Sequence, residues 1–137
     1  MNEFQKYKEA SIYSMSSAEL LQVLYNETIS RLTKAEIALD DQAYELFEDN
    51  IHRVSRIVRY LDDILDMQQP ISRDLRRIYS YLIVDLSRVN AGRERQKEEI
   101  ARIRNILSEL GGAFDEAGKK APGVQGSLQF QDKGVRG

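Results

Sequence analysis

The stretch from Tyr44 to Leu65, YELFEDNIHRVSRIVRYLDDIL, decides the fold. Its apolar residues recur at alternating steps of three and four, which is the seam of a helix that packs on other helices. The seam positions are Tyr44, Phe47, Ile51, Val54, Val58, Leu61 and Leu65. Ile57 and Ile64 widen the apolar stripe on one side, which indicates packing against two neighbours. The pattern therefore predicts a helix over residues 42–67, which Pro70 prevents from continuing.

Three further segments carry the same period. The first, residues 16–39, opens with Ser16-Ser17-Ala18-Glu19, a pattern typical of a capping box. The third, residues 72–90, is expected to begin with Ser72 as its cap and to end before Gly92. The fourth, residues 94–116, contains Gly111-Gly112, which should weaken its end. Their seam positions are Leu21, Leu24, Thr28, Leu32, Ala35 and Leu39, then Leu75, Tyr79, Leu82, Leu86 and Val89, then Ile100, Ile103, Leu107, Leu110 and Phe114.

These segments predict an all-α protein whose architecture is an antiparallel up-down four-helix bundle. Each helix is about 20 residues, or about 30 Å, long, and the short connections force successive helices to be antiparallel neighbours. Residues 16–117 form the bundle. Residues 1–15 precede it as an N-terminal arm that can hold an extra short helix, and residues 118–137 follow it as a flexible tail rich in Gly, Lys and Gln.

The composition excludes several classes of function. A net charge of -2 over 137 residues gives no basic field for nucleic acid, and the absence of cysteine excludes disulfides and thiolate metal sites. No apolar run approaches the ~20 residues of a membrane span, and the N-terminus has no apolar core of a secretory signal. We expect no cofactor and no metal. The sequence has no Gly-rich phosphate loop or nucleophile elbow, so an enzyme is not expected.

His52, the only histidine, lies three residues after Asp49. Diiron bundles use such a carboxylate–histidine pair twice, whereas this sequence has one pair and no second histidine. A solvated surface histidine is therefore the favoured interpretation. A phosphotransfer domain acting through His52 is an alternative, although Arg56 stands where those domains need a small residue.

Two basic stripes at helical spacing accompany this histidine. They consist of Arg53, Arg56 and Arg59, and of Arg73, Arg76 and Arg77. We interpret them as a solvated face with ion pairs rather than an anion site. Tyr81 falls two residues after the seam residue Tyr79, so it cannot share that buried face, and it is a candidate contact for a partner.

Several motifs, in order, resemble the FliS family of flagellar export chaperones. The resemblance covers about Tyr7 to Ala117. It includes Tyr7, Ile12, Ser14, Ser16 and Glu19-Leu20, then Leu24-Tyr25-Asn26, Ile57-Val58, Leu61 and Leu65-Asp66, then Ile78-Tyr79-Ser80-Tyr81, Val89-Asn90, and Phe114 in place of a usual Trp. The chain departs from the family pattern at Glu27, at Arg53-Val54 and at Val84-Asp85.

The resemblance implies a cytoplasmic bacterial chaperone, not an enzyme, that serves the flagellar type III secretion system. It would bind the disordered C-terminal segment of flagellin as helices in apolar grooves, prevent premature polymerisation and keep the flagellin competent for export. The arm would cover a groove in the absence of cargo. The implied partner-binding residues are Tyr7, Ile12, Leu24, Tyr25, Asn26, Ile57, Leu61, Ile78, Tyr81, Leu82 and Asn90.

Further expectations concern partners and assembly. The flagellar export gate is a second candidate partner, and the protein is expected to be a monomer or a weak dimer. The competing hypothesis is a helical-bundle adaptor whose seam serves another coiled-coil partner or self-association.

Overall fold

The computed structural model describes residues 17–120, with side chains described as far as residue 116. Its elements are α2 (Ser17–Asp40), α3 (Tyr44–Asp63), α4 (Ile71–Gly92), the short 3-10 helix η1 (Arg93–Gln96) and α5 (Lys97–Lys120). Every regular element in this range is helical, so the all-α prediction is confirmed for the described residues. The predicted N-terminal arm and most of the tail lie outside them.

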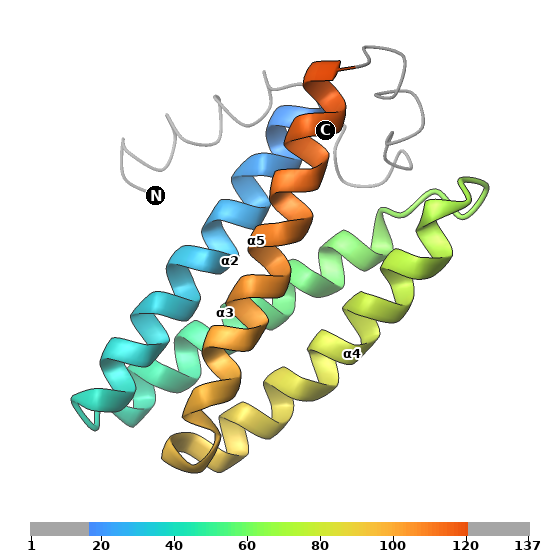
Figure 1. Ribbon diagram of the computed structural model, residues 1–137. Coiled ribbons are helices and arrows are strands. Elements are labelled where there is room, and N and C mark those ends of the chain that lie inside the picture. The colour runs from blue at the N-terminus through green and yellow to red at the C-terminus, as the bar shows by residue number, and fades with distance from the viewer. Residues whose placement is uncertain (1–16, 121–137) are drawn as a thin grey trace, which may run out of the picture.

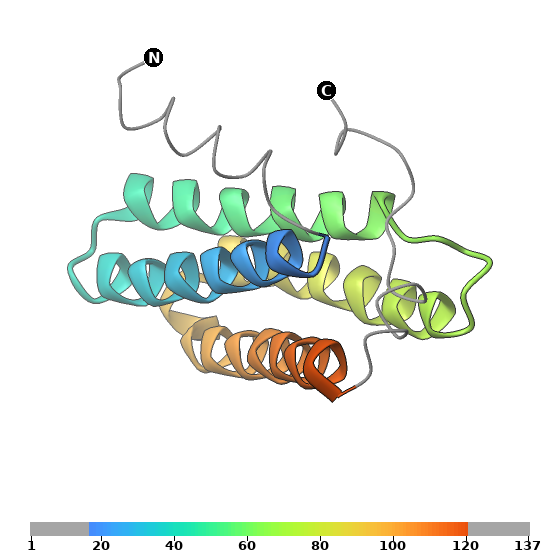
Figure 2. The ribbon, with the colours of Figure 1, turned by 90° about the horizontal axis from the view of Figure 1, so that it is seen from above.

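Each long helix runs opposite to the one before it, as the colour sequence in Figure 1 shows. The closest packing joins α2 to α3 and to α5, and α3 to α4, whereas α4 and α5 approach each other much less. Seen from above (Figure 2), α3 and α5 lie on opposite sides, with α2 and α4 between them. Helix α2 is therefore the element on which both α3 and α5 are assembled.

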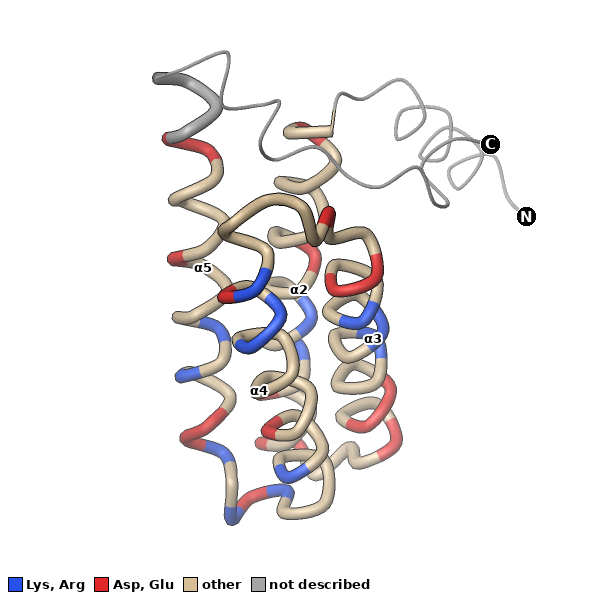
Figure 3. Tube along the Cα trace, turned by 90° about the vertical axis from the view of Figure 1, so that its right-hand side faces the viewer, with Lys and Arg blue, Asp and Glu red and all other residues tan. Residues whose placement is uncertain are grey.

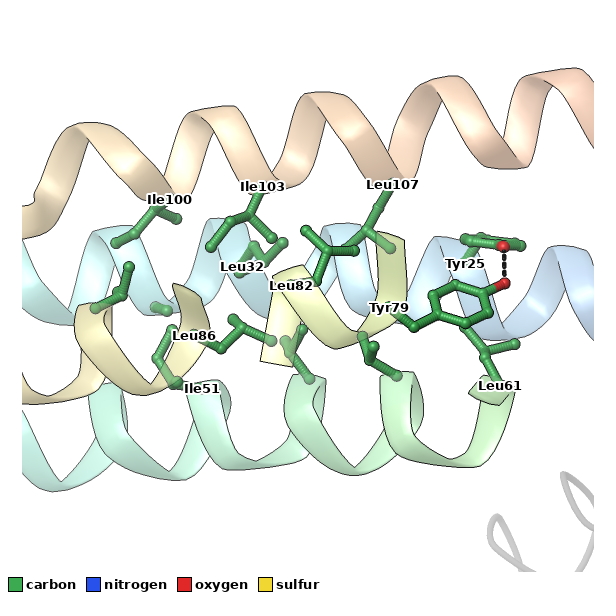
Figure 4. Close-up of a cluster of buried hydrophobic side chains, with 14 of the residues drawn as sticks. Tyr25, Leu32, Ile51, Leu61, Tyr79, Leu82, Leu86, Ile100, Ile103 and Leu107 are labelled. Atoms are coloured by element: carbon green, nitrogen blue, oxygen red, sulfur yellow. Dashed lines mark hydrogen bonds between the residues drawn. The ribbon is translucent and has the colours of Figure 1, made fainter. Parts of the chain in front are cut away.

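The core consists of the seam residues of all four long helices. Phe47, Ile51, Val54, Val58 and Leu61 of α3 are at most 1% exposed, as the heptad pattern predicts. Figure 4 shows Leu82 and Leu86 of α4 directed toward the same interior as Leu32 of α2 and Ile100, Ile103 and Leu107 of α5. Burial of each large aliphatic side chain contributes about 1.5–3 kcal/mol, so the continuous seam supplies the main driving force for folding.

One polar contact crosses this apolar interior. The hydroxyls of Tyr25 on α2 and Tyr79 on α4 lie 2.5 Å apart and share a hydrogen bond (Figure 4). Both rings are essentially unexposed. Burial raises the pKa of Tyr79 to about 12 and raises the pKa of Tyr25 further above its ordinary value of 10.0. The pair is therefore neutral, and each hydroxyl depends on the other for its partner.

The environment of Tyr25 depends on the C-terminal half of α5. The Phe114 ring stacks on the Tyr25 ring with centroids 5.8 Å apart and an interplanar angle of 25°. A Cβ at Gly111 would lie 3.3 Å from Tyr25 Cβ, and the Gly111 carbonyl accepts a 2.7 Å hydrogen bond from Gln22 Nε2. Helix α5 continues through Gly111-Gly112 to Lys120, and Gly111 allows the close approach of α2.

The connection between α3 and α4 differs from the prediction. Helix α3 ends at Asp63 rather than near residue 67, and the Asp66 side chain accepts the Gln68 N–H at 3.0 Å in a local turn. Ser72 does not cap α4, which begins at Ile71. Its hydroxyl is buried and donates to the Asp66 carbonyl at 2.6 Å. The sequence pattern missed this because a serine can satisfy a loop carbonyl as well as a helix N–H.

The other two connections turn on residues with a left-handed backbone. Gln42, with φ 55°, follows α2, which ends at Asp40, one residue beyond the predicted range of 16–39. Arg93, with φ 53°, follows α4. Glycine was expected to end α4, but Gly92 is still helical and Arg93 takes the left-handed position. The Arg93 guanidinium lies 4.2 Å from the centre of the Tyr44 ring and pairs with Glu48 at 3.3 Å, which anchors this connection to α3.

The tyrosine pair generates a test of how the core is held together. Tyr25→Phe or Tyr79→Phe leaves the remaining hydroxyl buried without a partner, so each single change should lower the free energy of unfolding by about 1–3 kcal/mol. The double change removes both hydroxyls and should cost clearly less than the sum of the single changes. Urea unfolding of the four proteins at pH 7 measures this. Strictly additive losses would contradict a direct hydrogen bond.

Candidate functional site

The structure divides the predicted partner-binding residues into three groups. Tyr25, Leu61 and Leu82 lie in the core with at most 1% exposure, so no partner reaches them in this conformation. Leu24, Ile57, Ile78 and Asn90 are half-buried, and Asn26 and Tyr81 are exposed. Tyr7 and Ile12 lie outside the described residues. The side chains that a partner can reach are therefore spread over α2, α3 and α4.

A groove of about 350 Å³ lies between α3 and α4. Its α3 wall presents His52, Ser55, Arg56 and Arg59, and its α4 wall presents Ile83, Leu86, Ser87 and Asn90, with Ile51 also in contact. Both walls follow the spacing i, i+3, i+4, i+7, so each is one face of a helix. Asn90 is the one residue of the predicted set that lines it.

The basic stripe of α3 is divided by this groove. Arg53 pairs with Asp49 at 3.0 Å on the outside of α3, while Arg56 and Arg59 line the groove beside His52. Figure 3 shows this basic section in the middle of α3, with acidic residues towards both ends of the helix. The interpretation of the stripe as a face with ion pairs therefore holds for Arg53, whereas no ion pair among residues 17–116 includes Arg56 or Arg59.

Spacing alone could have identified the α4 wall. Ile83, Leu86 and Ser87 precede Asn90 by seven, four and three residues, so they share its face of a helix. Treating Asn90 as an isolated family signature concealed this relation. The structure also shows that the Asn90 Oδ1 atom is buried without a hydrogen-bond partner among the described residues. Such an atom costs free energy.

A second surface lies along α4 and α5. Tyr81 is 40% exposed, and the Arg102 guanidinium lies 5.6 Å from the centre of its ring. Arg102 also pairs with Glu99 at 3.6 Å. Tyr81 is therefore accessible, as predicted, and it is held beside charged residues of α5 rather than standing alone on α4.

Below this surface, Asp85 is buried in the α4–α5 seam. It is 4% exposed, and its Oδ2 atom has no hydrogen-bond partner among the described residues. Burial, together with a hydrogen bond to Glu99 and the charge of that residue, raises the pKa of Asp85 above its ordinary value, while the nearby Arg102 and Arg88 oppose this. The charged form of Asp85 is therefore disfavoured in the folded protein relative to a carboxyl group in water.

Neither a metal site nor a membrane span is found in the part of the chain that the structure describes. Among residues 17–116 no three His, Asp or Glu side chains come together as a metal-binding group. None of the described helices is long and apolar enough to cross a bilayer. His52 is exposed at the rim of the groove, as expected for a surface histidine.

Comparison with known proteins identifies the family. The model of the flagellar protein FliS family matches residues 1–121. The chain belongs to the FliS family. FliS proteins are flagellar chaperones, so the protein has a chaperone role in the flagellum. A search of curated proteins found no match. The match includes both surfaces described above and all of residues 1–16, which the structure does not describe.

Asp85→Asn tests whether burial of the Asp85 carboxylate lowers the stability of the protein. Because the pKa of Asp85 is raised in the folded protein, its contribution to stability is complete below the ordinary carboxyl pKa of 3.8 and is lost as the pH rises through the folded value. The asparagine side chain has the shape of aspartate without its charge, so the free energy of unfolding at pH 7 should rise by about 1 kcal/mol.

The measurement is urea unfolding of both proteins between pH 4 and pH 8 at steps of about one unit. The gain should shrink toward pH 4, where the wild-type carboxyl is protonated. Asp63→Asn, at an exposed position, is the matched control and should change little. A gain that is equally large in acid would show that charge is not its cause.

Proposed function

We propose that the protein is a flagellin-specific export chaperone. It binds the disordered C-terminal segment of flagellin as helices in apolar grooves on its surface, prevents premature polymerisation and keeps the flagellin competent for type III export. The observation that carries this proposal is the family match over residues 1–121. The protein acts in the bacterial cytoplasm as a monomer or weak dimer. The flagellar export gate is the second partner, to which the chaperone brings its bound flagellin.

The helical surface has the features that such binding needs. An apolar helix face docks into a groove between two helices through anchors at i, i+3, i+4 and i+7. The residues on each wall of the α3–α4 groove follow the same helical spacing over two turns, so the groove runs along both helices. Half-buried Ile57 and Ile78 pack against the core and still offer apolar surface at the outside, as does Tyr81. The cargo loses conformational entropy when it folds on this surface, which keeps the net affinity moderate and allows release.

The buried members of the predicted set have a different role in this proposal. Tyr25, Leu61 and Leu82 belong to the core, so they hold α2, α3 and α4 at the separation that forms the grooves. The accessible members contact the cargo directly. The family signature Leu24-Tyr25-Asn26 therefore has two roles. Tyr25 supports the fold, while Leu24 and Asn26 are accessible and contact the cargo.

We assign the architecture to the up-down four-helix bundle, which the antiparallel course of the four long helices supports (Figure 1). Residues 1–15 act as an arm that covers a groove when cargo is absent, and the tail begins after Lys120, where α5 ends, rather than at residue 118. His52 phosphotransfer and a general adaptor role are the weaker alternatives, because the family match favours a chaperone.

Calorimetric titration with the C-terminal segment of flagellin tests the function. The segment should be about 40 residues, long enough to form helices. We expect saturable binding near one to one with a strongly negative heat-capacity change, because folding of the segment buries apolar surface. Tyr81→Ala should weaken binding about tenfold if the ring is an anchor.

Two observations keep this test specific. Ile37→Ala removes another exposed apolar side chain, on α2, and should leave binding unchanged. No heat of binding with a folded, monomeric sample would refute the proposal and would leave the adaptor role in its place.

A further inference from the structure

The two walls of the α3–α4 groove differ in charge. On the α3 wall, His52, Arg56 and Arg59 succeed one another at steps of four and three, so they form one row along the helix. From His52 to Arg59 the row spans about 10 Å. The α4 wall carries only uncharged groups, with Ile83 and Leu86 as its apolar part and Ser87 and Asn90 as its polar part. Any segment that occupies the groove therefore meets cations along one edge only.

Three carboxylates along α3 are engaged elsewhere, and exposed Asp63, four residues after Arg59, forms no ion pair among the described residues. Asp49 pairs with Arg53 at 3.0 Å, and Asp62 pairs with Arg76 of α4 at 3.1 Å. At the beginning of α3, Glu48 pairs with Arg93 at 3.3 Å. None of these carboxylates neutralises Arg56 or Arg59 in the described structure, although the whole chain has a net charge of -2. The positive row is thus a local feature and not a consequence of overall composition.

From these observations we infer that the α3–α4 groove takes an amphipathic helix with an acidic edge, and that this helix belongs to the flagellin cargo. The inference rests on the proposed function and adds the charge and orientation of the bound segment. Carboxylates of the cargo helix, one turn apart, face Arg56 and Arg59. Its apolar face covers Ile83, the half-buried apolar residue of the lining, and its third edge is uncharged and faces Ser87 and Asn90.

This arrangement makes binding directional as well as salt-dependent. A groove without charge accepts an amphipathic helix that runs in either direction along it, whereas a row of cations on one wall favours the direction that brings carboxylates to that wall. Arg56 and Arg59 are exposed, so each pair contributes modestly and is screened by salt. Because Ile51 and Leu86 are at most 1% exposed, Ile83 is the apolar lining residue that a bound helix can cover, and the row of arginines sets the orientation.

The test is calorimetric titration of the full-length protein with the C-terminal segment of the flagellin from the same organism. The double variant Arg56→Gln/Arg59→Gln should lower the affinity about tenfold at low salt, or about threefold for each pair lost. The difference should nearly vanish when sodium chloride is raised from about 0.05 M to about 0.5 M. Circular dichroism of the variant should match the wild type, because both side chains are exposed.

Arg73→Gln/Arg77→Gln is the matched control. It removes the same charge from exposed positions of α4 that do not line the groove, and it should leave the affinity unchanged. A flagellin segment whose Asp and Glu residues are replaced by Asn and Gln should bind both the wild type and the Arg56→Gln/Arg59→Gln variant equally.

The outcomes separate the inference from the function on which it rests. If the wild type binds the segment and the Arg56→Gln/Arg59→Gln variant binds it with the same affinity, the acidic-edge inference is overturned and the chaperone function stands. The same holds if the Arg73→Gln/Arg77→Gln control loses as much affinity as the Arg56→Gln/Arg59→Gln variant. No binding of the wild type to the segment would refute the chaperone function, and the inference with it.

Discussion

The buried hydrogen bond between Tyr25 and Tyr79 is the constraint on which the rest of the structure depends. It joins α2 to α4, the two helices that lie between α3 and α5 (Figure 2). Burial of either hydroxyl without the other costs about 1–3 kcal/mol, because the remaining hydroxyl has no partner. The bond therefore specifies how far apart α2 and α4 lie, and the aliphatic seam fills the space that this separation defines. Gly111 and Phe114 complete the same end of the molecule by receiving the Tyr25 ring.

A rigid interior has a direct consequence for the surface. Because the seam residues of α3 and α4 are committed to the core, the residues one position along each helix form the walls of the groove between them. Ile51 and Leu86 belong to both regions, since they are buried in the core and also line the groove. A cargo helix in that groove would therefore rest on side chains that the core already holds in place. Binding then needs ordering of the cargo, while the chaperone itself changes little.

The helices could be predicted from the sequence because their signal is periodic and repeated. Seven consecutive seam positions between Tyr44 and Leu65 agree with one another, and all but the half-buried Tyr44 lie in the core. The ends were harder, because single side chains decide them. Ser72 could serve as a cap or close a loop, and only the position of the Asp66 carbonyl settles which. Helix propensity describes an isolated helix, and on that basis Gly111 should weaken α5. The contact of Gly111 with Tyr25 is tertiary, so propensity does not indicate it.

The candidate site was predictable only in part, for a related reason. Family motifs mark residues that matter without distinguishing support of the fold from contact with a partner, so Tyr25, Leu61 and Leu82 entered the predicted set although they are buried. Asp85 was visible as a departure from the family pattern, but its burial against α5 depends on three-dimensional packing. The groove combines residues of α3 and α4 that are about 30 positions apart, and nothing in a periodic pattern indicates which faces of two helices meet.

Hydrogen exchange of the full-length protein, measured by mass spectrometry with and without the flagellin C-terminal segment, tests the central claim that cargo folds onto a preformed helical surface. The account predicts that the cargo segment becomes protected. It also predicts that exchange slows over α3 and α4 where they border the groove, while the slowly exchanging amides around Tyr25 and Tyr79 keep their rates or exchange more slowly. Faster exchange around Tyr25 and Tyr79 on binding would contradict it, because the core would then have to open to admit the cargo.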